Sequence, residues 1–178
     1  MNVLSRLAFA SALVGGFLAA AGPGTLVEPA PAEAQRLRAQ VFITQHRIPR
    51  DTSERGLIRF ARGHRARNLR ETTDENIAER EWRANMVTSF SRPVGDLEFQ
   101  VLFYELEGNT RRFLGPPLST MISDRDQKTF LQRLRLERPR FEPDKRYELV
   151  VVVRHQEVGR ARFETRGEEI RHTGEVNF

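Results

Sequence analysis

The run RYELVVVVRHQ (residues 146–156) constrains the fold most, because four consecutive valines favour a β-strand that is covered on both faces. Apolar residues also recur at every second position in EWRANMVTSF (81–90) and DLEFQVLFYEL (96–106). A period of two is the pattern of strands, and turn residues such as Pro93 and Gly95 separate the runs. Short strands at this spacing predict an antiparallel β-sandwich rather than an α/β fold.

The segment RFEPDKRYELVVVV (140–153) resembles the corner that leads into the sixth strand of immunoglobulin-like and fibronectin-type-III-like sandwiches. Pro143 and Asp144 stand where those folds turn, and Tyr147 stands where they carry a tyrosine. The resemblance implies that the Tyr147 hydroxyl hydrogen-bonds to backbone atoms a few residues upstream, within residues 140–144.

The resemblance covers residues 82–166 in outline and implies a fold without implying an activity. Three features depart from the usual pattern. The chain has no cysteine, Trp82 falls on the expected second strand instead of the third, and a basic segment is inserted at about 51–79. We therefore expect one mainly β domain at residues 35–178, an immunoglobulin-like sandwich with an inserted helix.

The first 34 residues have the pattern of a signal peptide. Arg6 precedes the apolar run LAFASALVGGFLAAAG (7–22), and AEA (32–34) offers the small-x-small pattern of a cleavage site. The run is shorter than the roughly 20 residues of a spanning helix, although a retained membrane anchor is an alternative. We predict a signal peptide at residues 1–34 and a periplasmic or secreted protein without a stable transmembrane segment after cleavage.

The segment RGLIRFARGHRARNLR (55–70) is the candidate binding region. Asp51, Thr52 or Ser53 can cap a helix, in which Leu57, Ile58, Ala61 and Leu69 would share one apolar stripe. The simplest interpretation is a solvated basic face over a packed stripe, and the alternative is a surface for an anionic partner. The candidate residues for that partner are Arg55, Arg59, Arg62, Arg65, Arg67 and Arg70.

No motif for catalysis or for a cofactor accompanies these features. The four histidines lack the spacing of a zinc site, and the sequence has neither a G-x-S-x-G motif nor a glycine-rich phosphate loop. We therefore predict no metal site, no cofactor and no enzymatic activity. The export signal and the lack of a nucleic-acid-binding motif disfavour nucleic acid as a partner.

Two kinds of partner remain. The first is another envelope protein, met at a sheet edge or at the basic helix, because strand addition is a recurring mode of recognition for sandwiches. The second is an anionic surface of lipid or polysaccharide, since each arginine near an anionic membrane contributes about 1 kcal/mol. A helix whose apolar side covers the sandwich cannot also insert that side into a bilayer.

Overall fold

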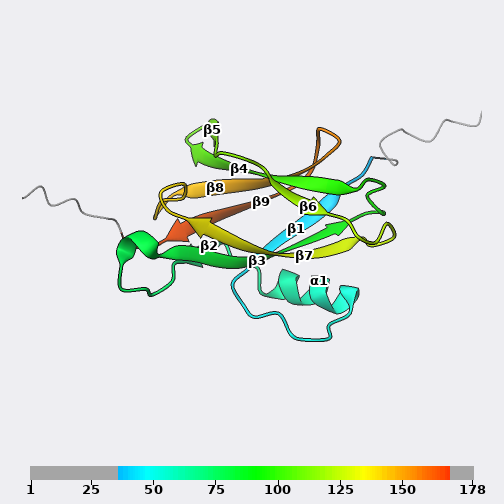
Figure 1. Cartoon of the computed structure of the whole chain (residues 1–178), viewed down its shortest axis with the longest axis horizontal. Helices are drawn as coiled ribbons and strands as arrows, with labels where there is room; N and C mark the ends of the chain where they lie inside the picture. Colours follow the sequence, from blue (N-terminus) through cyan, green and yellow to red (C-terminus); the bar gives the residue numbers. More distant parts are fainter. Residues whose placement is uncertain (1–35, 169–178) are drawn as a thin grey trace, which may run out of the picture. The chain divides into compact units, whose positions relative to one another are not determined.

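The computed structural model describes residues 36–168, which form two β-sheets and one α-helix (Figure 1). The first sheet has the order β1-β3-β7, and the second has the order β2-β9-β8-β4-β5 with β6 also paired to β4. The elements are β1 Ala39–Thr44, α1 Glu54–Gly63, β2 Asn68–Arg70, the 3₁₀ turn η2 Ile77–Glu79, β3 Glu81–Phe90, β4 Glu98–Glu107, β5 Thr110–Phe113, β6 Leu118–Met121, β7 Thr129–Glu137, β8 Arg146–Val153 and β9 Gln156–Arg166. The predicted signal peptide lies outside the described residues.

The strand order is that of an immunoglobulin-like sandwich. Strands β1, β3 and β7 face β4, β8 and β9, which correspond to strands A, B and E facing C, F and G. The pairs within each sheet are antiparallel, except that β2 runs parallel to the end of β9. The predicted mainly β, antiparallel sandwich is therefore confirmed.

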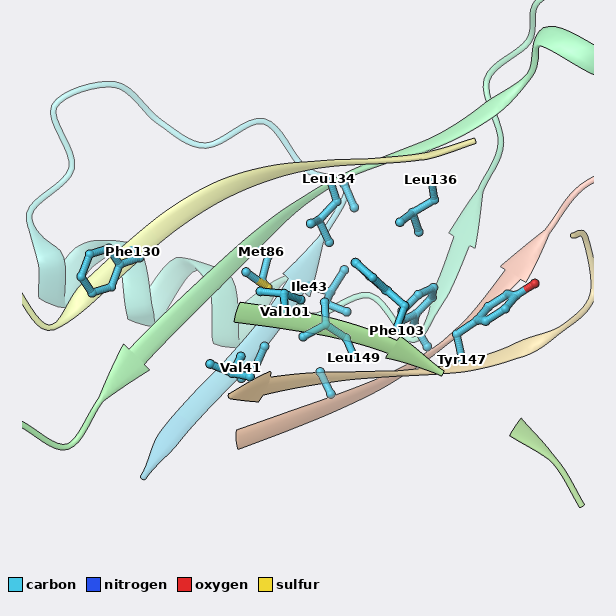
Figure 2. Packing of buried hydrophobic residues seen from close by; sticks show 14 of the residues in the cluster. Val41, Ile43, Met86, Val101, Phe103, Phe130, Leu134, Leu136, Tyr147 and Leu149 are labelled. Carbon is cyan, nitrogen blue, oxygen red and sulfur yellow. The ribbon is translucent and has the colours of Figure 1, made fainter. Parts of the chain in front are cut away.

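The apolar core lies between the two sheets, as the period of two in the sequence predicts. Figure 2 shows Val41, Met86 and Leu134 from the first sheet and Val101 and Leu149 from the second within one cluster. Alternate residues of β3 point into this cluster, and the aromatic side chains of β3, β4 and β7 meet edge to edge near one end of the sandwich. Pairing of these inward faces is what excludes water from the interior.

Strand β8 is buried on both of its faces. Leu149 and Val151 point into the core, whereas Glu148 and Val150 are equally buried on the outer face of the second sheet. The expectation for this valine-rich run is confirmed. Its outer face is covered by long side chains of the same sheet, Arg162 among them, rather than by a further layer of structure.

Tyr147 forms the corner at the start of β8. Its ring packs against Phe141 and Phe163, and its hydroxyl accepts a hydrogen bond from the backbone N–H of Glu142 at 2.8 Å. Pro143 is buried, and Asp144 adopts a left-handed φ of 55° that lets the chain turn into the strand. The hydroxyl therefore ties the corner to the strand that follows.

The inserted helix is shorter than the predicted 51–79. It spans Glu54–Gly63, and Ser53 caps it because its side-chain oxygen accepts the Gly56 N–H at 3.3 Å. Gly63 is the last helical residue, in keeping with its low helix propensity. Residues 71–80 hold only the short turn η2, which Asn76 caps rather than Thr73 or Asp74, and β3 begins at Glu81.

Leu69 was wrongly placed on the helical stripe. It lies in β2 and is fully buried in the sandwich core, where the strand pairs with the end of β9. Burial of a leucine side chain stabilises a fold by about 1.5–3 kcal/mol, which outweighs the small helical preference of this segment. Consequently Arg65, Arg67 and Arg70 do not belong to α1.

Two glycine substitutions test the packing of these elements. A Cβ at Gly159 would meet the carbonyl oxygen of Ala39, because β9 passes close to β1 there, so we expect Gly159→Ala to lower the free energy of unfolding by about 1–3 kcal/mol. A Cβ at Gly63 meets nothing within 4 Å, so Gly63→Ala should raise stability by up to about 1 kcal/mol. Urea unfolding measures both changes, and equal effects of the two substitutions would contradict the close approach of β9 to β1.

The buried corner predicts a specific response to alkaline pH. Burial raises the pKa of Tyr147 to about 12 from an ordinary value of 10. The neutral phenol is favoured in the folded state, so its contribution to stability is complete below pH 10 and is lost as pH rises towards 12. Since the chain has only two tyrosines, Tyr104→Phe leaves a single phenol, which we expect to ionise near pH 12 by ultraviolet absorbance. Ionisation near pH 10 in the folded protein would contradict this assignment.

Candidate binding surfaces

Positive charge is concentrated in the first part of the described chain. Residues 36–70 hold ten arginines and only two acidic residues, Asp51 and Glu54. Residues 71–168 hold seventeen basic and eighteen acidic residues, so that part is close to neutral. The excess of positive charge therefore lies on the segment that carries β1, α1 and β2.

Most arginines of the sandwich itself form ion pairs with acidic side chains of the same domain. Arg138 is only 7% exposed, donates to Glu71 at 2.7 Å and lies over the Trp82 ring at 5.2 Å. Burial alone would raise the pKa of Glu71, but hydrogen bonds from the Glu168 N–H and from Arg138 outweigh it, and the net pKa is lowered. Glu71 therefore stays ionised and forms ion pairs with both Arg138 and Arg80, the latter at 3.4 Å.

A second buried carboxylate lies on the outer face of the second sheet and pairs with two arginines. Glu148 is 0% exposed, and its oxygens lie 2.8 Å from Arg162 and 2.9 Å from Arg111. Arg111 also lies over the Tyr104 ring at 4.4 Å. These guanidinium groups neutralise a buried charge whose desolvation would otherwise be unfavourable.

Helix α1 covers the outer face of the first sheet. Ala61 is fully buried and, with Leu57 and Ile58, packs against Phe42 of β1 and Val87 of β3. The apolar side of the helix is therefore occupied by the sandwich, which rules out insertion of that side into a bilayer.

The exposed side of α1 carries three of the predicted arginines. Arg62 donates to the Gln40 side chain at 3.3 Å and lies over the Phe42 ring at 5.9 Å. Arg55 and Arg59 are exposed and contact no acidic side chain within residues 36–168. This face therefore offers guanidinium groups that the described part of the protein does not neutralise.

The structure does not gather the six predicted arginines on one surface. Arg65 and Arg67 line a hollow of about 430 Å³ beside the second sheet, together with Arg146 of β8 and Arg162 of β9. The backbone of Arg70 is hydrogen-bonded to the Gln45 side chain, and Arg70 does not line this hollow. Periodicity could not have identified Arg146 and Arg162, because they follow Arg67 by more than 75 residues and reach it only through the pairing of β2, β9 and β8.

Several large apolar side chains are exposed at the strand ends and sheet edges. Met121 of β6 is 69% exposed and lies opposite Glu98, and Leu97 and Phe113 are also exposed. Leu131 of the end strand β7 is 46% exposed and lies opposite Val87, on the face of the first sheet that α1 covers. Apolar surface next to the basic helix is thus accessible to a partner.

Residues 36–168 contain no group of three histidine, cysteine, aspartate or glutamate side chains arranged to hold a metal ion. In the same range, no helix has the length and apolar character needed to cross a membrane.

One solved structure shares the fold of this chain in outline. An immunoglobulin-like protein from Pseudomonas aeruginosa is similar to this chain at 10% sequence identity with a TM-score of 0.40, covering 74% of this chain and 97% of that one. No protein-family model and no curated protein matches the chain. The assignment of an immunoglobulin-like sandwich therefore depends on the strand order and on the Tyr147 corner.

Two similar substitutions should differ in their effect on stability, because one removes an ion-paired arginine and the other removes an exposed arginine without an acidic partner. Arg138→Gln leaves Glu71 buried beside a single arginine, so we expect the free energy of unfolding to fall by about 3 kcal/mol. Arg59→Gln removes an exposed side chain without an acidic partner and should change stability by less than about 0.5 kcal/mol. Urea unfolding at neutral pH measures both, and a large loss for Arg59→Gln would show that this arginine is structural.

Proposed function

We propose that the protein is a non-catalytic, exported binding module of a bacterial-type envelope, which contacts an acidic surface of another protein through α1. The observation that carries the proposal is the pair of exposed, uncompensated arginines Arg55 and Arg59 on a helix whose apolar side is fixed to the sandwich. Because the helix is already packed, its charged face is presented without a folding cost on binding. Export is inferred from the signal-peptide pattern of residues 1–34.

The state of the buried acids supports binding rather than catalysis. Hydrogen bonds from Arg135 and Arg83 lower the pKa of Glu81, and Glu71 is likewise held ionised by arginine. A general acid or base works best with a pKa near the ambient pH, and these carboxylates are moved away from it. Their role is consistent with holding the sandwich together.

Two features favour a protein over a membrane as the partner of α1. Three arginines on one helix would contribute about 3 kcal/mol at an anionic membrane, which gives only weak and reversible docking. The exposed Leu131 on the same face of the first sheet adds apolar surface, and protein interfaces combine an apolar centre with arginine. A partner with acidic residues around an apolar contact would match this surface.

Photo-crosslinking tests the proposal. A photoreactive residue in place of Leu131, in the protein expressed in its source envelope, should yield a discrete cross-linked protein. Arg55→Glu with Arg59→Glu should abolish that product, because both charges facing the partner are reversed. The matched control is Arg65→Glu with Arg67→Glu, which reverses two arginines of the same segment away from α1 and should keep the product. A product that is insensitive to the first pair of changes would refute the role of α1.

An anionic surface of lipid or polysaccharide is the second candidate, because the exposed guanidinium groups of α1 are also suited to phosphate and carboxylate. Sedimentation with vesicles containing phosphatidylglycerol, over a series of salt concentrations, separates it from the first. A membrane module should bind at low salt and lose affinity as salt rises. Absence of binding even at low ionic strength eliminates the lipid form of this candidate.

A further inference from the structure

The hollow beside the second sheet has the composition of an anion site. Its volume is about 430 Å³, within the range of small-molecule pockets. The lining includes Arg65, Arg67 and Asn68 from the α1–β2 connection and β2, and Arg146 from β8. Leu106 supplies partly exposed apolar surface, whereas the side chains of Tyr147 and Phe163, which also border the hollow, are almost fully buried in the core.

Three of the arginines that line the hollow have no acidic partner. Arg65, Arg67 and Arg146 form no ion pair within residues 36–168. Glu164 is the only acidic residue among the described residues that line the hollow, and its carboxylate accepts a hydrogen bond from Arg166 at 2.7 Å. The fourth arginine, Arg162, is paired with the buried Glu148. Among described side chains, the hollow therefore has an excess of three uncompensated positive charges.

The backbone that carries these arginines is held in place. The Ala66 N–H donates to the Ile43 carbonyl at 2.7 Å, and the Glu164 N–H donates to the Arg67 carbonyl at 2.7 Å. Glu164 in turn lies opposite Arg146 on β8 and beside Asn68 on β2. Three segments distant in the sequence thus hold the backbone of these polar residues side by side, which lowers the entropic cost of binding.

We propose that this hollow binds an organic anion that carries two or more phosphate groups. A single carboxylate would leave two of the three charges uncompensated, whereas a diphosphate supplies a matching negative charge and enough oxygens for several guanidinium groups. The hollow is larger than a phosphate group requires, and the partly exposed Leu106 can contact the body of the ligand.

The site is separate from the protein-docking surface proposed for α1. Helix α1 packs on the outer face of the first sheet, whereas the hollow is lined by β2, β4, β8 and β9 of the second. Loss of one function need not affect the other, so variants at each surface serve as controls for each other.

Calorimetric titration of the protein with pyrophosphate and with inorganic phosphate tests the proposal. We expect saturable binding of pyrophosphate that is tighter than that of phosphate. Arg65→Ala with Arg67→Ala should weaken pyrophosphate binding at least tenfold, because two charge-assisted hydrogen-bonding groups are removed. Arg55→Ala with Arg59→Ala removes the same charge from α1 and should change the affinity less than threefold. Arg146→Gln, a single change on β8, provides a second and independent test with an expected loss of about tenfold.

Vesicles distinguish a free ligand from a lipid headgroup. Binding to vesicles containing CDP-diacylglycerol, a lipid with a diphosphate headgroup, that is competed by pyrophosphate and lost in the Arg65/Arg67 variant would support the site with a lipid as its source. Pyrophosphate binding without vesicle binding would support it with a soluble ligand. Failure of pyrophosphate to saturate, or equal weakening in the two double variants, would overturn the proposal and leave that for α1 intact.

Discussion

The burial of β8 on both faces is the constraint on which the rest of the structure depends. Its inward residues Leu149 and Val151 join the core, and its outward Glu148 is equally buried. An apolar strand in the centre of a sheet needs a partner on each side and a cover on each face. Strands β4 and β9 supply the partners, the first sheet covers one face, and arginine side chains including Arg162 cover the other.

Arginine therefore has two distinct roles in this protein. In the sandwich it neutralises buried carboxylates such as Glu71 and Glu148, where removing one partner would leave a charge without compensation. In residues 36–70 arginines such as Arg59 and Arg65 project from the fold without an acidic neighbour. The same residue type thus stabilises one part of the molecule and leaves another part with unneutralised charge.

The sequence predicted the sandwich well because strand periodicity and the Tyr147 corner are local signals. It predicted α1 only in part, since the apolar stripe of the helix and the alternation of β2 overlap at Leu69, and the choice between them is made by β9. The pairing of arginines was not predictable, because the partners are far apart in the sequence, as Glu71 and Arg138 are. An exposed arginine and an ion-paired arginine are the same residue type, so the sequence does not distinguish them. Only the tertiary fold shows which arginines have an acidic partner.

The position of β2 explains how one basic segment comes to lie on two surfaces of the protein. If the helix had continued through Leu69, its arginines would all have followed α1 over the first sheet. Instead the chain leaves the helix at Gly63, buries Leu69 in the core and pairs with β9, which takes Arg65 and Arg67 to the second sheet. A single buried leucine thus divides the positive charge between the two layers.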